Sequence, residues 1–173
     1  MTSRASGYAC EITAATDGRR LLGTYLNDHR AGAAGGASLA HRIADAAANT
    51  TRGPELAALA RQIDEDREFL DRLIADSGFR QSQLKTSLGW VGERVGRLKT
   101  NGGLFGRSPL SPVLELEALL AGVEAKRSLW ATLLENPVGG ATADELQQHL
   151  ERAESQRQRL EEQHRQAASA APL

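Results

Sequence analysis

Several ionisable side chains fall in or beside the apolar seams of the expected helices. A helix turns by about 100° per residue, and the spacing of these residues places them inward rather than on outer faces. Burying a charge is costly unless the charge is paired or binds a metal ion. The sequence therefore predicts a buried polar layer that comprises Asp28, His29, Asp66, Glu117, Glu124 and Arg127, with His164 on the last helix beside it.

Each of these groups also has a purely structural interpretation. A histidine in an apolar seam, such as His29, is typically a hydrogen-bonded core residue, and Asp66 is a suitable partner for it. Glu124 and Arg127 are three residues apart, a spacing at which the two charges neutralise each other on a helix. Glu161 and His164 lie near the chain end on a charge-rich helix, where a solvated face is the simplest interpretation.

These side chains depend on long helices to position them. Apolar residues recur at helical spacing, and Pro54 and Pro112 fit the first turns of helices. Ser111 is the expected N-cap before Pro112, and Thr142 with Glu145 forms a capping box. The expected helices span Arg19 to Ala48, Pro54 to Asp76, Gln81 to Thr100, Ser111 to Glu135, and a stretch from the Thr142 cap to about Ala167.

The composition points to an all-α protein. The strong helix formers Ala, Leu, Glu, Arg and Gln dominate, while aromatic residues make up 4% of the 173 residues. We expect a single helical-bundle domain over residues 19–168, between a flexible N-terminal segment (1–18) and a flexible tail (169–173). The core should include Leu26, Ile63, Leu70, Leu120 and Val123.

Charge and cysteine content exclude several classes of protein. The net charge of −1 does not predict a nucleic-acid partner, and the mildly basic residues near Arg97 lack aromatic side chains on which bases could stack. No stretch approaches the roughly 20 apolar residues that span a membrane. The single cysteine, Cys10, cannot form an internal disulfide, and we expect a cytoplasmic protein.

Two packings are compatible with this pattern of helices. Five helices could run up and down in turn. Alternatively, the first two and the last two could form hairpins, joined by a crossover from Phe79 to Leu110 that carries its own helix. The short turns near Gly53 and Gly139, against the long segment between them, favour the second packing. That connectivity is the one found in ferritin-like bundles.

Parts of the chain resemble an uncharacterised family of bacterial ferritin-like proteins. The resemblance covers roughly Leu21 to Leu134. It rests on the strings Tyr25-Leu26-Asn27-Asp28-His29, Gly96-Arg97-Leu98-Lys99-Thr100-Asn101-Gly102 and Ser108-Pro109-Leu110-Ser111-Pro112, followed by Leu114-Glu115-Leu116-Glu117. It implies a ferritin-like four-helix bundle with an additional helix in the crossover, and it implies no particular activity.

The resemblance also implies candidate metal ligands. Ferritin-like di-iron proteins use one carboxylate from each of two helices and Glu-x-x-His from the other two. Glu117 or Glu124 could serve as one of the lone carboxylates, and the candidate ligands are Asp28, His29, Glu124, Glu161 and His164. The second helix departs from the pattern, because Asp66-Arg67-Glu68-Phe69 has phenylalanine in place of the histidine. One half of a dimetal site is therefore missing.

These observations favour a non-catalytic helical-bundle module with a structural or protein-interaction role and no cofactor. The last helix has only a thin apolar seam and is otherwise rich in charge. We therefore expect it to form a bundle edge or to mediate self-association or contact with a protein partner. The competing hypothesis is a ferritin-like metal-binding protein or oxidase with a degenerate site for iron or manganese.

Overall fold

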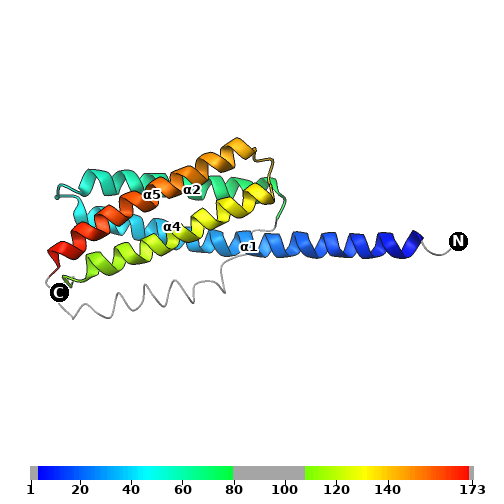
Figure 1. Cartoon of the computed structure of the whole chain (residues 1–173), viewed down its shortest axis with the longest axis horizontal. Helices are drawn as coiled ribbons and strands as arrows, with labels where there is room; N and C mark the ends of the chain where they lie inside the picture. Colours follow the sequence, from blue (N-terminus) through cyan, green and yellow to red (C-terminus); the bar gives the residue numbers. More distant parts are fainter. Residues whose placement is uncertain (1–3, 80–107, 172–173) are drawn as a thin grey trace.

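All regular secondary structure in the described part of the chain is helical. The structure is a computed structural model that describes residues 4–79 and 108–171, with side chains from residue 17 onward. Its helices are α1 (Arg4–Ala47), α2 (Gly53–Asp76), α4 (Ser111–Glu135) and α5 (Ala143–Ala170) (Figure 1). The described residues contain no strand, and the all-α prediction is confirmed.

Most helix ends lie within a few residues of their predicted positions. The capping box is present, since the Thr142 hydroxyl accepts from the Glu145 backbone N–H and the Glu145 carboxylate accepts from the Thr142 backbone N–H. The predicted N-cap at Ser111 is wrong, because Ser111 is already helical and Leu110 precedes the helix without a side-chain cap. The expected helix Gln81 to Thr100 lies outside the described residues.

α1 begins 15 residues earlier than the sequence predicted, at Arg4 rather than Arg19. The added stretch contains several alanines, and extending an existing helix costs little once its first turn has formed. With 44 residues α1 is about 66 Å long at 1.5 Å per residue, so its N-terminal part projects beyond the other helices (Figure 1). None of the helices in the described residues has the length and apolar composition needed to cross a membrane.

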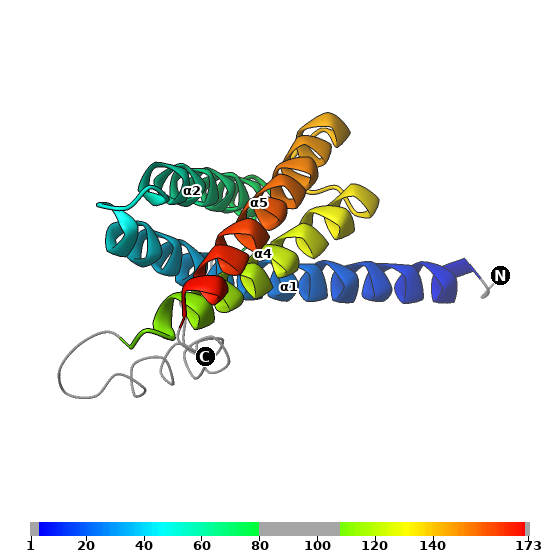
Figure 2. The ribbon, with the colours of Figure 1, turned by 60° about the vertical axis from the view of Figure 1, so that its left-hand side comes forward.

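The helices form two hairpins that pack on each other. α1 packs along α2, α4 packs along α5, and α1 also packs against α4. The α4–α5 pair is inclined to the α1–α2 pair (Figure 2). α2 and α4 run in the same direction, so α2 ends at the opposite end of the bundle from the start of α4 (Figure 1). Both packings considered above have these directions, and they differ in a segment that lies mostly outside the described residues.

The interior contains two apolar clusters, one toward each end of the bundle. The first includes Leu56, Leu59, Leu116, Leu119 and Leu160. The second includes Leu26, Leu70, Trp130, Leu133 and Leu146. The positions between the two clusters on α2, α4 and α5 carry polar side chains, and these form the site described below.

The predicted core is confirmed at four of five positions. Leu26, Ile63, Leu70 and Val123 are buried, whereas Leu120 is only half-buried. α4 places Leu119 inward instead, since adjacent residues on a helix point about 100° apart.

Glycine at position 139 is required by the loop between α4 and α5. Gly139 has a φ of 62°, and a Cβ there would lie 2.5 Å from the carbonyl oxygen of Leu73 on α2. Only a residue without a side chain fits this close approach in the left-handed region. The loop can therefore lie directly against the C-terminal end of α2, which fixes where α5 starts.

Candidate functional site

The carboxylate of Asp66 is the centre of a buried polar network. Asp66 lies on the inner face of α2, one turn from Ile63 and from Leu70, and its exposed fraction is 1%. The Lys126 ammonium on α4 donates to Asp66 Oδ2 at 2.5 Å, and the Gln156 amide on α5 donates to the same oxygen at 3.0 Å. One carboxylate thus joins α2, α4 and α5.

The second carboxylate oxygen of Asp66 is bound by two further residues of α5. His149 Nδ1 lies 2.9 Å from Oδ1, and an Arg152 N–H group lies 3.5 Å from it. Because an ionised carboxylate can only accept hydrogen bonds, Nδ1 of His149 must carry the proton. His149, Arg152 and Gln156 are three and four residues apart, so α5 presents all of them on one face. We call Asp66, Lys126, His149, Arg152 and Gln156 the Asp66 network.

Aromatic rings hold His149 in place. Its imidazole is stacked on Phe69 with ring centroids 4.0 Å apart and planes inclined by 11°. Trp130 packs against the same imidazole at 5.1 Å. With one face covered and Nδ1 bound to Asp66, the ring has a fixed orientation.

Burial and ion pairing act on the two central charges in different ways. Burial alone raises the pKa of Asp66, but the hydrogen bond from His149 and the Lys126 ammonium outweigh it and lower that pKa below its usual value. Burial lowers the pKa of Lys126, and attraction to Asp66 offsets only part of the effect. Asp66 is therefore well stabilised as an anion, while Lys126 depends on Asp66 for its charge.

The Asp66 network has little capacity left for chemistry. A carboxylate offers about four acceptor sites, and four donors already approach Asp66. The Lys126 ammonium also donates to the Gln156 side-chain oxygen. The network thus forms a polar layer between the two apolar clusters.

We expect the contribution of Asp66 to stability to disappear in acid. A carboxylate whose folded pKa is depressed stabilises the fold above its unfolded pKa, about 3.9 for aspartate, and loses this contribution as the pH falls through the folded pKa. Urea unfolding of the parent and of Asp66→Asn from pH 7 to about pH 3 measures the effect. The difference in the free energy of unfolding between the two proteins should narrow below about pH 4. A difference that stays constant with pH would contradict the lowered pKa of Asp66.

The structure places only part of the predicted polar layer inside the protein. Asp66 is buried as predicted, but Asp28, Glu117 and Glu124 are exposed, and for these three the prediction is wrong. Arg127 is also at the surface, with its side chain 39% exposed, and it binds Glu124 in the expected ion pair.

His29 is half-buried and does not bind Asp66. Its ring lies edge-on to Tyr25, with centroids 4.5 Å apart. Burial lowers the pKa of His29, and the nearby Asp28 offsets part of that shift. The predicted pairing of His29 with Asp66 is therefore wrong, and the histidine that binds Asp66 is His149 on α5.

The structure does not assemble the candidate metal ligands. Glu124 binds Arg127, and Glu161 binds Arg157 one turn earlier on the same helix. His164 Nε2 lies 3.2 Å from Glu117. Within residues 4–79 and 108–171, no three histidine, cysteine or acidic side chains lie close enough together to bind a metal ion.

Sequence reasoning missed Lys126, His149, Arg152 and Gln156. A signal was present for the residues of α5, because His149, Arg152, Gln156 and Leu160 recur at helical spacing. Lys126 could be found by its spacing from Val123 and Trp130, which are both buried on the same face of α4. The neighbouring Arg127, about 100° away around the helix, was selected instead.

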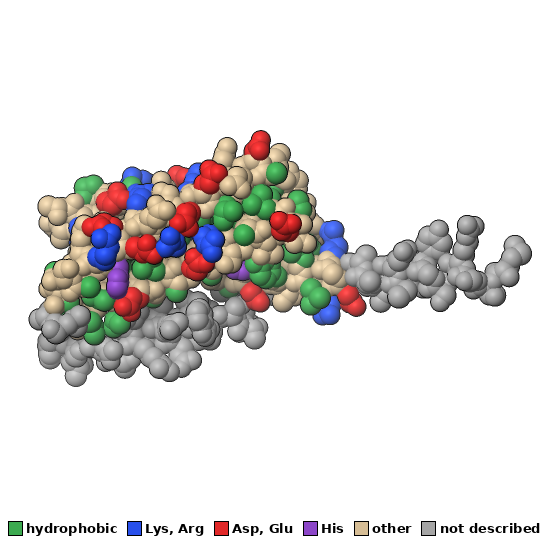
Figure 3. All heavy atoms as spheres, viewed as in Figure 1, with side chains coloured by type: hydrophobic (Ala, Val, Ile, Leu, Met, Phe, Trp, Pro, Cys, Tyr) green, Lys and Arg blue, Asp and Glu red, His purple; other side chains and the backbone are tan. Residues whose placement is uncertain are grey.

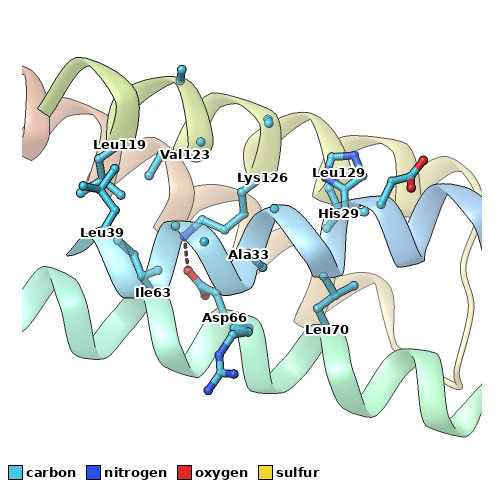
Figure 4. A pocket seen from close by; sticks show the side chains of 18 of the residues that line it. His29, Ala33, Leu39, Ile63, Asp66, Leu70, Leu119, Val123, Lys126 and Leu129 are labelled. Atoms are coloured by element: carbon cyan, nitrogen blue, oxygen red, sulfur yellow. Dashed lines mark hydrogen bonds and ion pairs between the residues drawn. The ribbon is translucent and has the colours of Figure 1, made fainter. Parts of the chain in front are cut away.

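An apolar cavity lies beside the Asp66 network, between α1, α2 and α4 (Figure 4). Its volume is about 390 Å³. The Lys126 side chain reaches across from α4 to Asp66 on α2, and the aliphatic side chains around this pair belong to both apolar clusters. The wall is mainly apolar, and alanine, leucine, isoleucine and valine residues line it together with glycines on α1 and α4. We call this space the α1/α2/α4 cavity.

Fold and site together define a class of protein: an all-α helical bundle with a buried polar network and an apolar cavity. No protein-family model, curated protein or solved structure matches this chain.

Proposed function

We propose that the protein is a non-catalytic helical-bundle module with a structural or protein-interaction role. The observation that supports this proposal is the closed Asp66 network, in which buried charges neutralise one another. A catalytic acid or base must be able to exchange a proton with a substrate, and a carboxylate with four donors around it is poorly suited to that task. A polar layer between apolar clusters instead favours one register of helices over others.

We further propose a ferritin-like connectivity without a metal centre. Two hairpins, with α2 and α4 running in the same direction, are compatible with that connectivity. At the centre of the bundle the Lys126 ammonium occupies the position beside Asp66 where a cation would bind. The candidate ligands of the outer faces are engaged with arginine or with one another.

Any partner of α5 has to recognise a charged surface. The apolar seam of α5 already packs inside the bundle through Leu146, Ala153 and Leu160. Acidic and basic side chains alternate over the visible face of α5 (Figure 3). Many are paired within the helix, as Arg157 is with Glu154 and Glu161. Contact with a partner through this helix would therefore be polar and sensitive to salt.

Thermal unfolding with and without metal tests the proposal. A metal that binds only the folded state, at 100 times its Kd, stabilises that state by about 2.7 kcal/mol, or roughly 5–10 °C for a chain of this length. We expect no such shift when chelator is replaced by iron, manganese or zinc. His29→Ala is the matched variant, and its change in Tm should not depend on metal. A shift present in the parent and lost in His29→Ala would favour the metal-binding alternative.

A further inference from the structure

We propose that the α1/α2/α4 cavity is a binding site for a small, neutral, largely apolar molecule with one hydrogen-bond acceptor. Small-molecule sites in proteins are typically concave spaces of about 300–1,000 Å³ with mostly apolar walls and a few polar groups. The cavity, at about 390 Å³, falls within this range. Leu39, Ile63, Leu70, Val123 and Leu129 supply much of its wall (Figure 4).

The charges around the cavity favour a neutral molecule. Among the described residues its wall contains two carboxylates, Asp28 and Asp66, and two cations, Arg67 and Lys126. Lys126 and Asp66 bind each other. Arg67 Nε lies 3.8 Å from Asp64, within ion-pair range but too far for a hydrogen bond, so it is a second buried donor of the wall without a hydrogen-bond partner in the described residues. Burial of His29 favours its neutral form. A charged ligand would bring an uncompensated charge into this space at a high desolvation cost.

Trp130 provides a donor for one acceptor on the ligand. Trp130 is one of the residues that line the cavity, and its exposed fraction is 1%. The indole Nε1 has no hydrogen-bond partner within the described part of the chain. A buried indole N–H normally has a partner, so an acceptor such as a carbonyl or hydroxyl oxygen on the ligand would satisfy it.

Glycines keep the wall of the cavity open. Gly32 and Gly36 on α1 and Gly122 on α4 line it, each in the interior of a helix where glycine is less favourable than alanine. A Cβ added at any of them would meet no described atom within 4 Å. Within the described residues no side chain closes the space at these three positions, and they allow it to be filled without a clash against the described backbone.

Binding of prodan, a neutral naphthalene with one carbonyl group, tests the proposal on the full chain. We expect saturable binding with one molecule per chain and a blue shift of its fluorescence. Gly36→Leu fills the cavity and should weaken binding by about tenfold or more. Gly18→Leu is the matched control, because it makes the same change on α1 at an exposed position outside the cavity wall, and its affinity should equal that of the parent.

Further variants protect the test against misfolding and examine the chemistry. Gly122→Leu fills the same cavity from α4 and should give the same loss of affinity. Each variant must retain a helical circular dichroism spectrum.

Trp130→Phe removes the hydrogen-bond donor. It should therefore weaken the binding of prodan but not that of naphthalene, which has no acceptor. Equal losses for both probes would overturn the assigned hydrogen bond. Equally tight binding of the anionic anilinonaphthalene sulfonate would overturn the preference for a neutral ligand.

Two results would assign the cavity to another occupant. The proposal would be overturned if the parent bound no prodan, or if Gly36→Leu bound it as tightly as the parent. The chain's own residues 80–107 would then be the next candidate to fill the space. Sedimentation velocity identifies the other case: a parent dimer that Gly36→Leu converts to a monomer would assign the cavity to a second copy of the chain.

Discussion

Replacing Asp66 with alanine should lower the free energy of unfolding by about 3–5 kcal/mol, the usual cost of breaking a buried ion pair by removing one partner. The carboxylate is 1% exposed and accepts hydrogen bonds from Lys126, His149 and Gln156, which would all lose their shared acceptor. Lys126 would then keep a buried charge without a counterion. Urea unfolding followed by circular dichroism measures the loss.

A matched control is a more exposed ion pair that also uses an aspartate of α2 and joins this helix to α1. Asp64 on α2 binds His41 on α1, with side chains 29% and 50% exposed. Asp64→Ala should therefore cost less than about 1 kcal/mol. If Asp66→Ala costs no more than Asp64→Ala, the Asp66 network is not the stabilising layer that the structure indicates.

A double variant separates the cost of an unpaired charge from the value of the pair. Asp66→Leu with Lys126→Met replaces both charges by apolar side chains, and such replacements are often neutral or stabilising. We expect the double variant to be more stable than Asp66→Ala.

In Asp66→Ala, burial should lower the pKa of Lys126 further, because the attraction to Asp66 is lost. The free energy of unfolding should then rise with pH, since the folded state releases this proton at a lower pH than the unfolded state does.

Replacing Leu133 with alanine should lower the free energy of unfolding by about 2–5 kcal/mol, because it leaves a cavity in the second apolar cluster. Leu133 on α4 has an exposed fraction of 0%. It packs in the cluster that contains Leu26, Leu70 and Leu146, so side chains from all of the described helices meet there. Guanidinium or thermal unfolding gives the change.

The control for this prediction is Leu21→Ala on α1. Leu21 is 61% exposed, and its truncation removes little apolar surface from the interior. Leu21→Ala should change the free energy of unfolding by less than about 0.5 kcal/mol, as substitutions at other surface sites do. Equal effects at positions 133 and 21 would mean that the C-terminal end of α4 does not pack against the other helices as described.

The two apolar clusters and the Asp66 network together explain how this bundle can hold one register. A fully apolar interface of leucine and alanine would allow neighbouring helices to slip by a turn at small cost. A slip of one turn would separate Asp66 from Lys126 and from Gln156, and would leave buried polar groups without partners. We therefore expect the network to favour one register of the helices, separately from its net effect on the free energy of unfolding.

Most helix ends were determined locally and could be predicted from the sequence, whereas the start of α1 and the N-cap of α4 were not. The Thr142 and Glu145 capping box and the proline at position 54 act within one or two turns of the chain. Apolar spacing likewise identified Leu26, Ile63, Leu70 and Val123 as core residues. These features depend on the geometry of one helix, which its own residues dictate.

Only the tertiary structure decided which charges are inside. Adjacent residues differ by about 100° around a helix, so a modest rotation exchanges Lys126 for Arg127, or Leu119 for Leu120, on the buried face. The spacing from Val123 and Trp130 points to Lys126 only once those two residues are known to be buried, and that depends on how α4 packs against α1 and α5. The same holds for the pairing of Asp66 with His149, 83 positions apart. The α1/α2/α4 cavity depends in the same way on the packing of three helices, and no single stretch of sequence specifies it.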